Sequence, residues 1–122
     1  MSEIRVTTVS DTAGTGPVTL TKQHAAKAWL NLDGTGTIAI NDSFNIASVN
    51  DSGSGAYAPS FTNSMSNSSY VANGSTTPGS GDYSVVAVSS LAQGSYTIFT
   101  SDGGSGQEDK DPVCSSVHGD LA

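Results

Sequence analysis

The feature that most constrains the fold is a stretch in which apolar and polar side chains alternate on both sides of an Asp-Gly pair. In AKAWLNL, residues 26–32, the alanines and leucines fall on one face of an extended chain and Trp29 falls on the other. Asp33-Gly34 follows, and this pair favours a tight hairpin because both residues readily adopt positive φ. Alternation resumes at residues 38–40. A period of two predicts two paired β-strands here.

Similar short runs recur along the chain, from residues 3–9 near its start to residues 113–117 near its end. About eight or nine short strands at regular spacing are typical of a β-sandwich or jelly roll. The fold class predicted is therefore all-β, an antiparallel β-sandwich or jelly-roll-like domain. We expect residues 1–15 to form an N-terminal strand or attachment arm and residues 16–122 to form the sandwich. A single helical turn near residues 22–26 is the one helical element expected.

Individual residues refine this expectation. Pro59 predicts that the strand over residues 57–61 lies at a sheet edge or is bulged, because proline lacks a ladder donor. The run over residues 83–90 has few polar interruptions, which predicts burial on both of its faces. A short strand at residues 69–72 and an exposed loop at residues 73–82 complete that half of the chain.

Turns are expected at three further places. Asn41-Asp42 predicts a second turn after the first hairpin, and the Gly/Ser-rich stretch between residues 49 and 57 predicts another. Asp102-Gly103 repeats the Asp-Gly hairpin signal.

The charge balance excludes several classes of partner. The formal net charge is −7 with only four Lys and Arg residues, so nothing basic is present to line a phosphate backbone. We therefore expect no nucleic acid partner. No run of about 18 apolar residues occurs, so we expect no membrane insertion, and the N-terminal residues have no apolar signal-peptide core.

Reactive side chains are sparse and scattered. His24 and His118 lie far apart, and Cys114, the single cysteine, is expected to be a small buried apolar residue. Glu108, Asp109 and Asp111 are expected to form a solvated turn, since a calcium loop would need oxygen ligands at alternating positions and a closing Glu. The Gly-rich pieces match no phosphate-binding loop. We expect no catalytic residues, no cofactor and no metal, and hence not an enzyme.

Candidate contact residues follow from the aromatic side chains and the polar loops. Trp29 lies opposite the aliphatic face of its strand, so it is expected to meet another sheet, a neighbouring subunit or a ligand. The predicted interface comprises Trp29, Tyr57 and Phe61. A loop rich in Ser, Asn and Tyr suits adaptable polar contacts. The predicted receptor-facing residues are Ser69, Tyr70, Asn73, Thr76 and Thr77.

Several short motifs, read together, resemble a module of tailed-bacteriophage virion proteins. The module has an A-K-A-W-x-N segment, a G-T-G turn, a D-S-F-N segment and a D-x-G-x-G-x-Y turn. The matching residues here are 26–31, 34–36, 42–46 with Ser48, 51–57, Phe61-Thr62, Met65 and 117–120. Residues 2–9 are similar to the start of many phage fibre proteins. The resemblance covers the chain from about residue 16 onward.

This resemblance implies a structural protein of the virion, assembled in the host bacterial cytoplasm. It implies a tail-fibre or appendage module that forms a homotrimer, contacts other virion proteins and takes part in attachment to a glycan or protein on the host surface. A capsid decoration or head-fibre protein is the alternative, and a carbohydrate-binding module or depolymerase is the second alternative. The resemblance carries no catalytic residues.

Overall fold

The computed structural model describes residues 25–77, 83–103 and 106–122, and these form eight strands and no helix. The strands are β1 (Ala28–Asp33), β2 (Ala39–Phe44), β3 (Ile46–Asp51), β4 (Ala56–Phe61), β5 (Val71–Thr76), β6 (Val85–Ser89), β7 (Thr97–Ser101) and β8 (Val113–His118). The strand predicted at residues 3–9 and the arm over residues 1–15 lie outside the described residues. Of the predicted helical turn, only residues 25 and 26 are described, and neither is helical.

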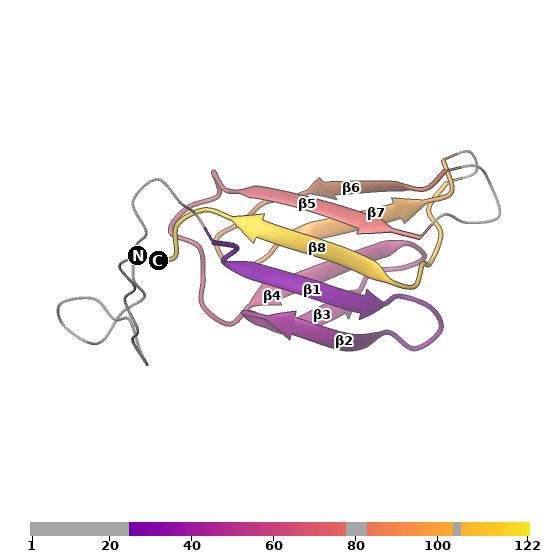
Figure 1. Cartoon of the computed structure of the whole chain (residues 1–122), viewed down its shortest axis with the longest axis horizontal. Helices are drawn as coiled ribbons and strands as arrows, with labels where there is room; N and C mark the ends of the chain where they lie inside the picture. The colour runs from indigo at the N-terminus through magenta and orange to yellow at the C-terminus, as the bar shows by residue number, and fades with distance from the viewer. Residues whose placement is uncertain (1–24, 78–82, 104–105) are drawn as a thin grey trace, which may run out of the picture.

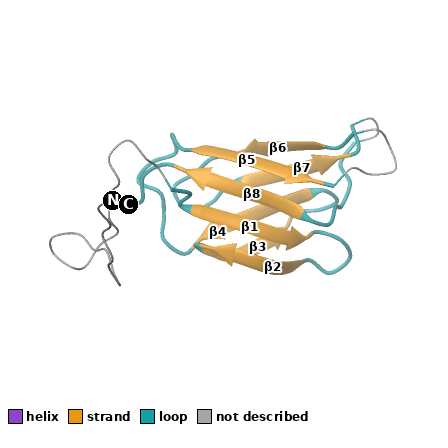
Figure 2. Ribbon diagram, in the orientation of Figure 1, coloured by secondary structure: helices purple, strands orange, loops and turns teal. Residues whose placement is uncertain are grey.

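Two four-stranded antiparallel sheets pack face to face (Figures 1 and 2). Sheet A has the strand order β2-β1-β8-β5, and sheet B has the order β3-β4-β7-β6. The prediction of an all-β antiparallel sandwich is confirmed. Because β1 and β8 are the two inner strands of sheet A, residues from opposite ends of the described chain lie side by side (Figure 1).

The alternation in the sequence sets which side chains enter the core. In β1, Ala28, Leu30 and Leu32 are buried, as predicted. In β8, Val113 and Val117 are buried in the same way. Burial of such aliphatic side chains stabilises the fold by about 1.5–3 kcal/mol each. Between the sheets they join a core that also contains residues of sheet B, of the segment between β4 and β5 and of the position just before β7: Tyr57, Phe61, Met65, Tyr70, Tyr96 and Ile98.

The first turn differs from the predicted two-residue hairpin. Residues 34–38 separate β1 from β2, and positive φ occurs at Gly36 (58°). The Asp33 carboxylate accepts hydrogen bonds from the Thr35 amide and hydroxyl at 2.8 and 2.6 Å. The Asp side chain therefore organises a longer turn, in which the left-handed position falls two residues later than expected.

The turn predicted at Asn41-Asp42 is wrong. Both residues lie within β2, where a register shift opposite Asn31 and Leu32 absorbs one extra residue. The chain turns instead at Asn45, which has a φ of 57° and carries the backbone from sheet A to sheet B.

Asn45 holds this corner through several hydrogen bonds. Its Nδ2 donates to the carbonyls of Lys27 and Asn63, both at 3.0 Å, and its Oδ1 accepts from the Asn63 amide at 2.7 Å. Asparagine is among the few residues that tolerate the left-handed region. The side chain thereby ties the entry of β1 to the exit of β4.

Pro59 does not mark an edge strand. It lies in β4, between β3 and β7, where it is buried and pairs with Val49. The carbonyl of Pro59 accepts from the Tyr96 amide at 3.2 Å. The missing donor interrupts the β4–β7 ladder, but pairing resumes in the same register at Ser60 and Ser95. One lost donor is thus tolerated inside the sheet.

The strand predicted to be buried on both faces is an edge strand. In β6, Val86 and Val88 pack against the core, whereas Val85 is 44% exposed. The predicted turn at Asp102-Gly103 is confirmed by a φ of 81° at Gly103. No paired strand follows it directly: after a single bridge between Ser101 and Gln107, the chain crosses to β8 in sheet A.

Candidate functional site

The outer face of sheet A carries a row of four neighbouring residues, one on each strand. Trp29 on β1 pairs with Phe44 on β2 and with Ser116 on β8, and Ser116 pairs in turn with Asn73 on β5. Residues directly opposite in neighbouring strands have their side chains on the same face, about 4.5–5.5 Å apart at Cβ. Trp29 is 37% exposed and Phe44 is 53% exposed. The row therefore places two aromatic rings beside two polar side chains in solvent.

A shallow hollow lies at the β5–β8 end of this row. It has a volume of about 200 Å³ and is lined by Asn73, Gly74, Ser75, Cys114, Ser115 and Ser116. No residue of sheet B lines it, so the hollow opens on the outer face of sheet A. The Ser116 hydroxyl donates to Asn73 Oδ1 at 2.7 Å, which orients the amide at its rim.

Of the three predicted interface residues, only Trp29 is at the surface. Tyr57 is fully buried and Phe61 is 7% exposed, so both are covered within the chain and the expectation that they meet a second surface is corrected. Phe61 stacks on Tyr96 at a centroid distance of 5.4 Å and meets Tyr70 edge-on at 5.8 Å. Tyr57 and Phe61 are buried by packing between the two sheets of the same chain, whereas the sequence predicted that a partner would cover them.

The predicted receptor-facing loop is corrected as well. Tyr70 is buried, and its hydroxyl donates to the Ala92 and Ser95 carbonyls at 3.0 and 2.9 Å. Asn73 and Thr76 belong to β5 instead of a loop.

Hydrogen bonds also tie down the end of this segment. The Thr76 and Thr77 hydroxyls donate to the carbonyls of Pro112 and Asp111 at 2.8 and 2.9 Å. Ser69, Asn73 and Thr77 are exposed. Residues 78–82, the remainder of the predicted loop, lie outside the described residues.

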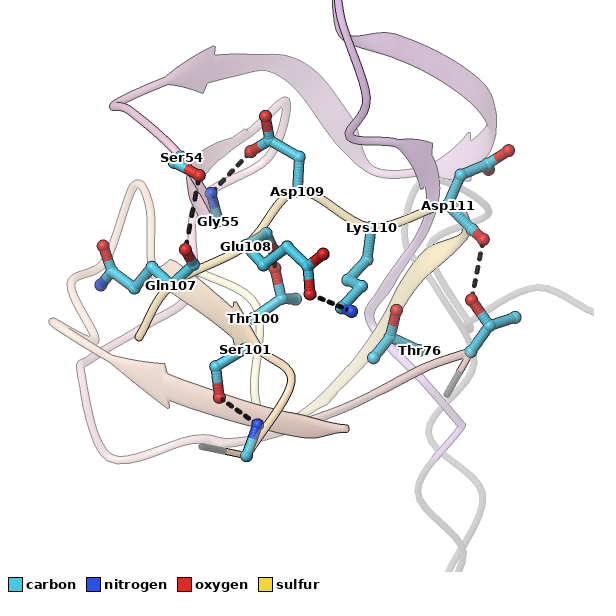
Figure 3. Close-up of polar contacts among 12 residues, drawn as sticks. Ser54, Gly55, Thr76, Thr100, Ser101, Gln107, Glu108, Asp109, Lys110 and Asp111 are labelled. Atoms are coloured by element: carbon cyan, nitrogen blue, oxygen red, sulfur yellow. Dashed lines mark hydrogen bonds and ion pairs between the residues drawn. The ribbon is translucent and has the colours of Figure 1, made fainter. Parts of the chain in front are cut away.

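The acidic segment expected to be a solvated turn is a connector that closes one end of the sandwich (Figure 3). Lys110 within it is only 5% exposed and pairs with the Glu108 carboxylate. The Asp109 carboxylate accepts from the Gly55 amide at 2.6 Å and from the Tyr57 hydroxyl at 3.1 Å. Glu108 and Asp111 are exposed, as a solvated turn predicts, whereas Asp109 is half-buried and Lys110 is buried where the connector runs from sheet B to sheet A.

Backbone groups complete the arrangement, which we call the polar cluster: Gly34, Gly55, Tyr57, Thr100 and residues 107–111. The Thr100 hydroxyl donates to the Glu108 carbonyl at 2.7 Å, and the Glu108 amide donates to the Thr100 carbonyl at 3.0 Å. The Gly34 amide donates to the Lys110 carbonyl at 2.9 Å. The cluster thus joins the β1–β2 turn, the β3–β4 turn and β7.

Gly55 is required at its position in this cluster. Its φ is +62°, and a Cβ there would lie 2.5 Å from the Thr100 carbonyl oxygen and 2.6 Å from the Glu108 amide nitrogen. Both the backbone conformation and the close approach exclude a side chain.

The side chains whose pKa values are shifted contribute to packing and turns. Desolvation by burial, together with the Asp109 charge, raises the pKa of Tyr57 to about 12. Burial raises the pKa of Tyr96 to about 12, and Tyr96 shares a 2.7 Å hydrogen bond with Ser115 in the core. Burial also raises the pKa of Tyr70. At the surface, hydrogen bonds from Thr35 lower the pKa of Asp33. These shifts accompany packing and turns, and none gathers around an open cavity.

The described ranges contain no group of three or more His, Cys, Asp or Glu side chains placed to hold a metal ion. His118 lies on β8, and His24 lies outside the described residues. Cys114 is half-buried at the hollow, where the sequence predicted full burial. Within the part of the chain that the structure describes, no helix is long and apolar enough to span a membrane.

The hollow and the row beside it are what sequence reasoning missed. Both depend on the pairing of β5 with β8, whose paired residues are about forty positions apart in the sequence. Asn73 and Ser116, for example, are separated by 43 residues. No local pattern signals such a site; Trp29 alone, on the polar face of its strand, pointed to this surface. A comparison with family models, curated proteins and solved structures finds no match for this chain.

Proposed function

We propose that this chain is a structural module of a tailed-bacteriophage virion, a β-sandwich that assembles as a homotrimer on a tail fibre or related appendage. The motifs that carry the resemblance supply the turns and corners of the sandwich. Asn45 of the D-S-F-N segment turns the chain between sheets. Gly55 and Tyr57 of the D-x-G-x-G-x-Y segment lie in the polar cluster. These structural uses support a scaffold role.

The single observation that carries the proposal is that β2, an edge strand of sheet A, exposes two large apolar side chains, one on each of its faces. Phe44 is 53% exposed and Ile40 is 40% exposed on this strand. An exposed apolar edge strand is a site of association unless another chain covers it. A closed homotrimer covers such an edge in every subunit at once.

The first experiment measures the solution mass of the purified full chain by light scattering coupled to size exclusion. The proposal expects three times the chain mass of 12.3 kDa, and a monomer at micromolar concentration would overturn the trimer.

The second experiment locates the protein in phage particles with an antibody raised against the chain. Signal on the tail or on a fibre supports the appendage role, whereas labelling over the whole head with hundreds of copies per particle would replace it with capsid decoration. Absence of the protein from purified particles would overturn both.

A further inference from the structure

We infer that the hollow between β5 and β8 binds one ring of a neutral saccharide, with Trp29 as the aromatic side of the site. The inference goes beyond the structural role proposed above and rests on it only for the source of the sugar, a glycan on the surface of the phage's host. It is argued from the lining, the size and the charge of the hollow.

The lining provides hydrogen-bonding groups at spacings that suit a sugar. Asn73, Ser75 and Ser116 are exposed or half-buried and lie on the outer face, whereas Gly74 and Ser115 lie at inward positions and give the hollow a backbone floor. A hydroxyl both donates and accepts, and an amide offers two donors. Because Asn73 Oδ1 already accepts from Ser116, the amide NH2 is oriented before a ligand arrives.

Trp29 supplies the second half of the chemistry. It is the cross-strand partner of Ser116, which lines the hollow, and it is 37% exposed. An indole buries a large apolar surface against the C–H groups of a sugar ring, while the ring's hydroxyls need polar partners. An aromatic platform beside a few convergent polar groups is the composition of a small-molecule site.

The size of the hollow and the charge of its lining limit the class of ligand that can bind there. At about 30 Å³ for each water in the liquid, a hollow of about 200 Å³ holds the volume of about six waters. One sugar ring fits this space, and a folded peptide segment does not. Among the described residues, no acidic or basic side chain lines the hollow, so nothing there is placed to pair with an anionic group, and the chain carries a net charge of −7. A neutral sugar is therefore favoured over an anionic one.

Two unique reporters make the test direct, since the chain has one tryptophan and one cysteine. Trp29 is the cross-strand partner of Ser116 in the lining of the hollow, and Cys114 is itself one of the lining residues. The full chain is titrated with methyl glycosides of glucose, galactose, mannose and N-acetylglucosamine. Trp29 fluorescence and the rate of Cys114 alkylation by N-ethylmaleimide are followed together. We expect at least one glycoside to change the emission and to slow alkylation with the same saturating concentration dependence.

Single substitutions then show which side chains contact the sugar. Ser116→Ala and Ser75→Ala are each expected to weaken binding about tenfold, the equivalent of one hydrogen bond to the ligand. Trp29→Ala should abolish protection of Cys114. The matched control is Val85→Ala, which truncates an exposed apolar side chain on β6 of sheet B, and it should leave the affinity within about twofold. Circular dichroism checks that each variant is folded, and Ser75, which is exposed, is the variant that least disturbs packing.

The outcomes separate cleanly. If no glycoside changes either reporter, or if the emission changes without protection of Cys114, the inference is overturned. Equal losses from Val85→Ala and Ser116→Ala would also overturn it, because they would indicate non-specific apolar contact. A negative sugar result together with the protein on virion tails overturns the inference and leaves the structural role intact.

Discussion

The polar cluster at one end of the sandwich and the outer face of sheet A have similar side-chain chemistry and opposite surroundings. In the polar cluster, carboxylates, hydroxyls and amides face one another across three turns, and Lys110 is buried among them. On the outer face, Ser116 and Asn73 bond to each other and the aromatic rings beside them face solvent. The difference teaches that polar residues where strands end bond to one another across the end of the sandwich and stabilise the fold, whereas those on the flat outer face stay in contact with solvent.

Substitution of Gly55 tests the polar cluster most severely. In Gly55→Ala, the new Cβ would meet backbone atoms of Thr100 and Glu108, which cannot rotate away. We expect the free energy of unfolding to fall by about 4 kcal/mol, or the chain not to fold. The matched control is Gly36→Ala, at a similar φ of +58° but with no atom within 4 Å of the new Cβ. It should cost only about 1–2 kcal/mol. Urea denaturation followed by circular dichroism measures both, and equal losses would refute the role of close packing.

The buried lysine separates charge from packing. Lys110→Ala removes a buried aliphatic stem as well as the ion pair with Glu108, whose side chain is 50% exposed. We expect a loss of about 2 kcal/mol, mainly from the lost apolar contacts. Lys110→Met keeps an apolar stem and should cost less than about 1 kcal/mol, since the Glu108 carboxylate that it leaves is half-exposed and such an ion pair contributes little. Urea midpoints of the two variants decide between these contributions; a larger loss for Met than for Ala would contradict the packing account.

The tyrosines set how stability depends on alkaline pH. The folded-state pKa of Tyr57 and that of Tyr96 are each raised to about 12, whereas an unfolded tyrosine titrates near about 10. Their contribution is complete below pH of about 10 and is lost as the pH rises toward about 12, because only the unfolded chain releases the proton easily. Tyr57→Phe should lower stability at neutral pH by about 1 kcal/mol through the lost hydroxyl bonds and make the alkaline decline shallower. Thermal melts across that pH range measure the decline, and an unchanged slope would exclude Tyr57 as a cause.

The contrast between local and distant contacts also explains which features of the fold and of the candidate site could be predicted from the sequence. The alternation of β1 and β8 fixes their buried faces, because period and burial agree within each segment. Residues whose environment depends on distant segments were misjudged. Tyr57 and Tyr70 meet carbonyls that lie about 20 residues or more away (23 and 22 residues). Lys110 stands among acidic neighbours that suggest solvent, and no local signal reveals that the connector closes the sandwich. The hollow could not be predicted either, because its lining comes from two strands that are far apart in the sequence.

The smallest effect on stability is expected on the outer face, at the apolar edge of sheet A. Phe44→Ser exchanges a half-exposed ring on β2 for a hydroxyl, so the free energy of unfolding should change by less than about 1 kcal/mol. Val71→Ser is the matched control, on the opposite edge strand β5, where Val71 is 65% exposed. If the β2 edge is where subunits meet, Phe44→Ser shifts the light-scattering mass toward the monomer and Val71→Ser does not. The reverse pattern would place the subunit contact at β5, over the hollow, and a sugar could then bind only to the dissociated chain.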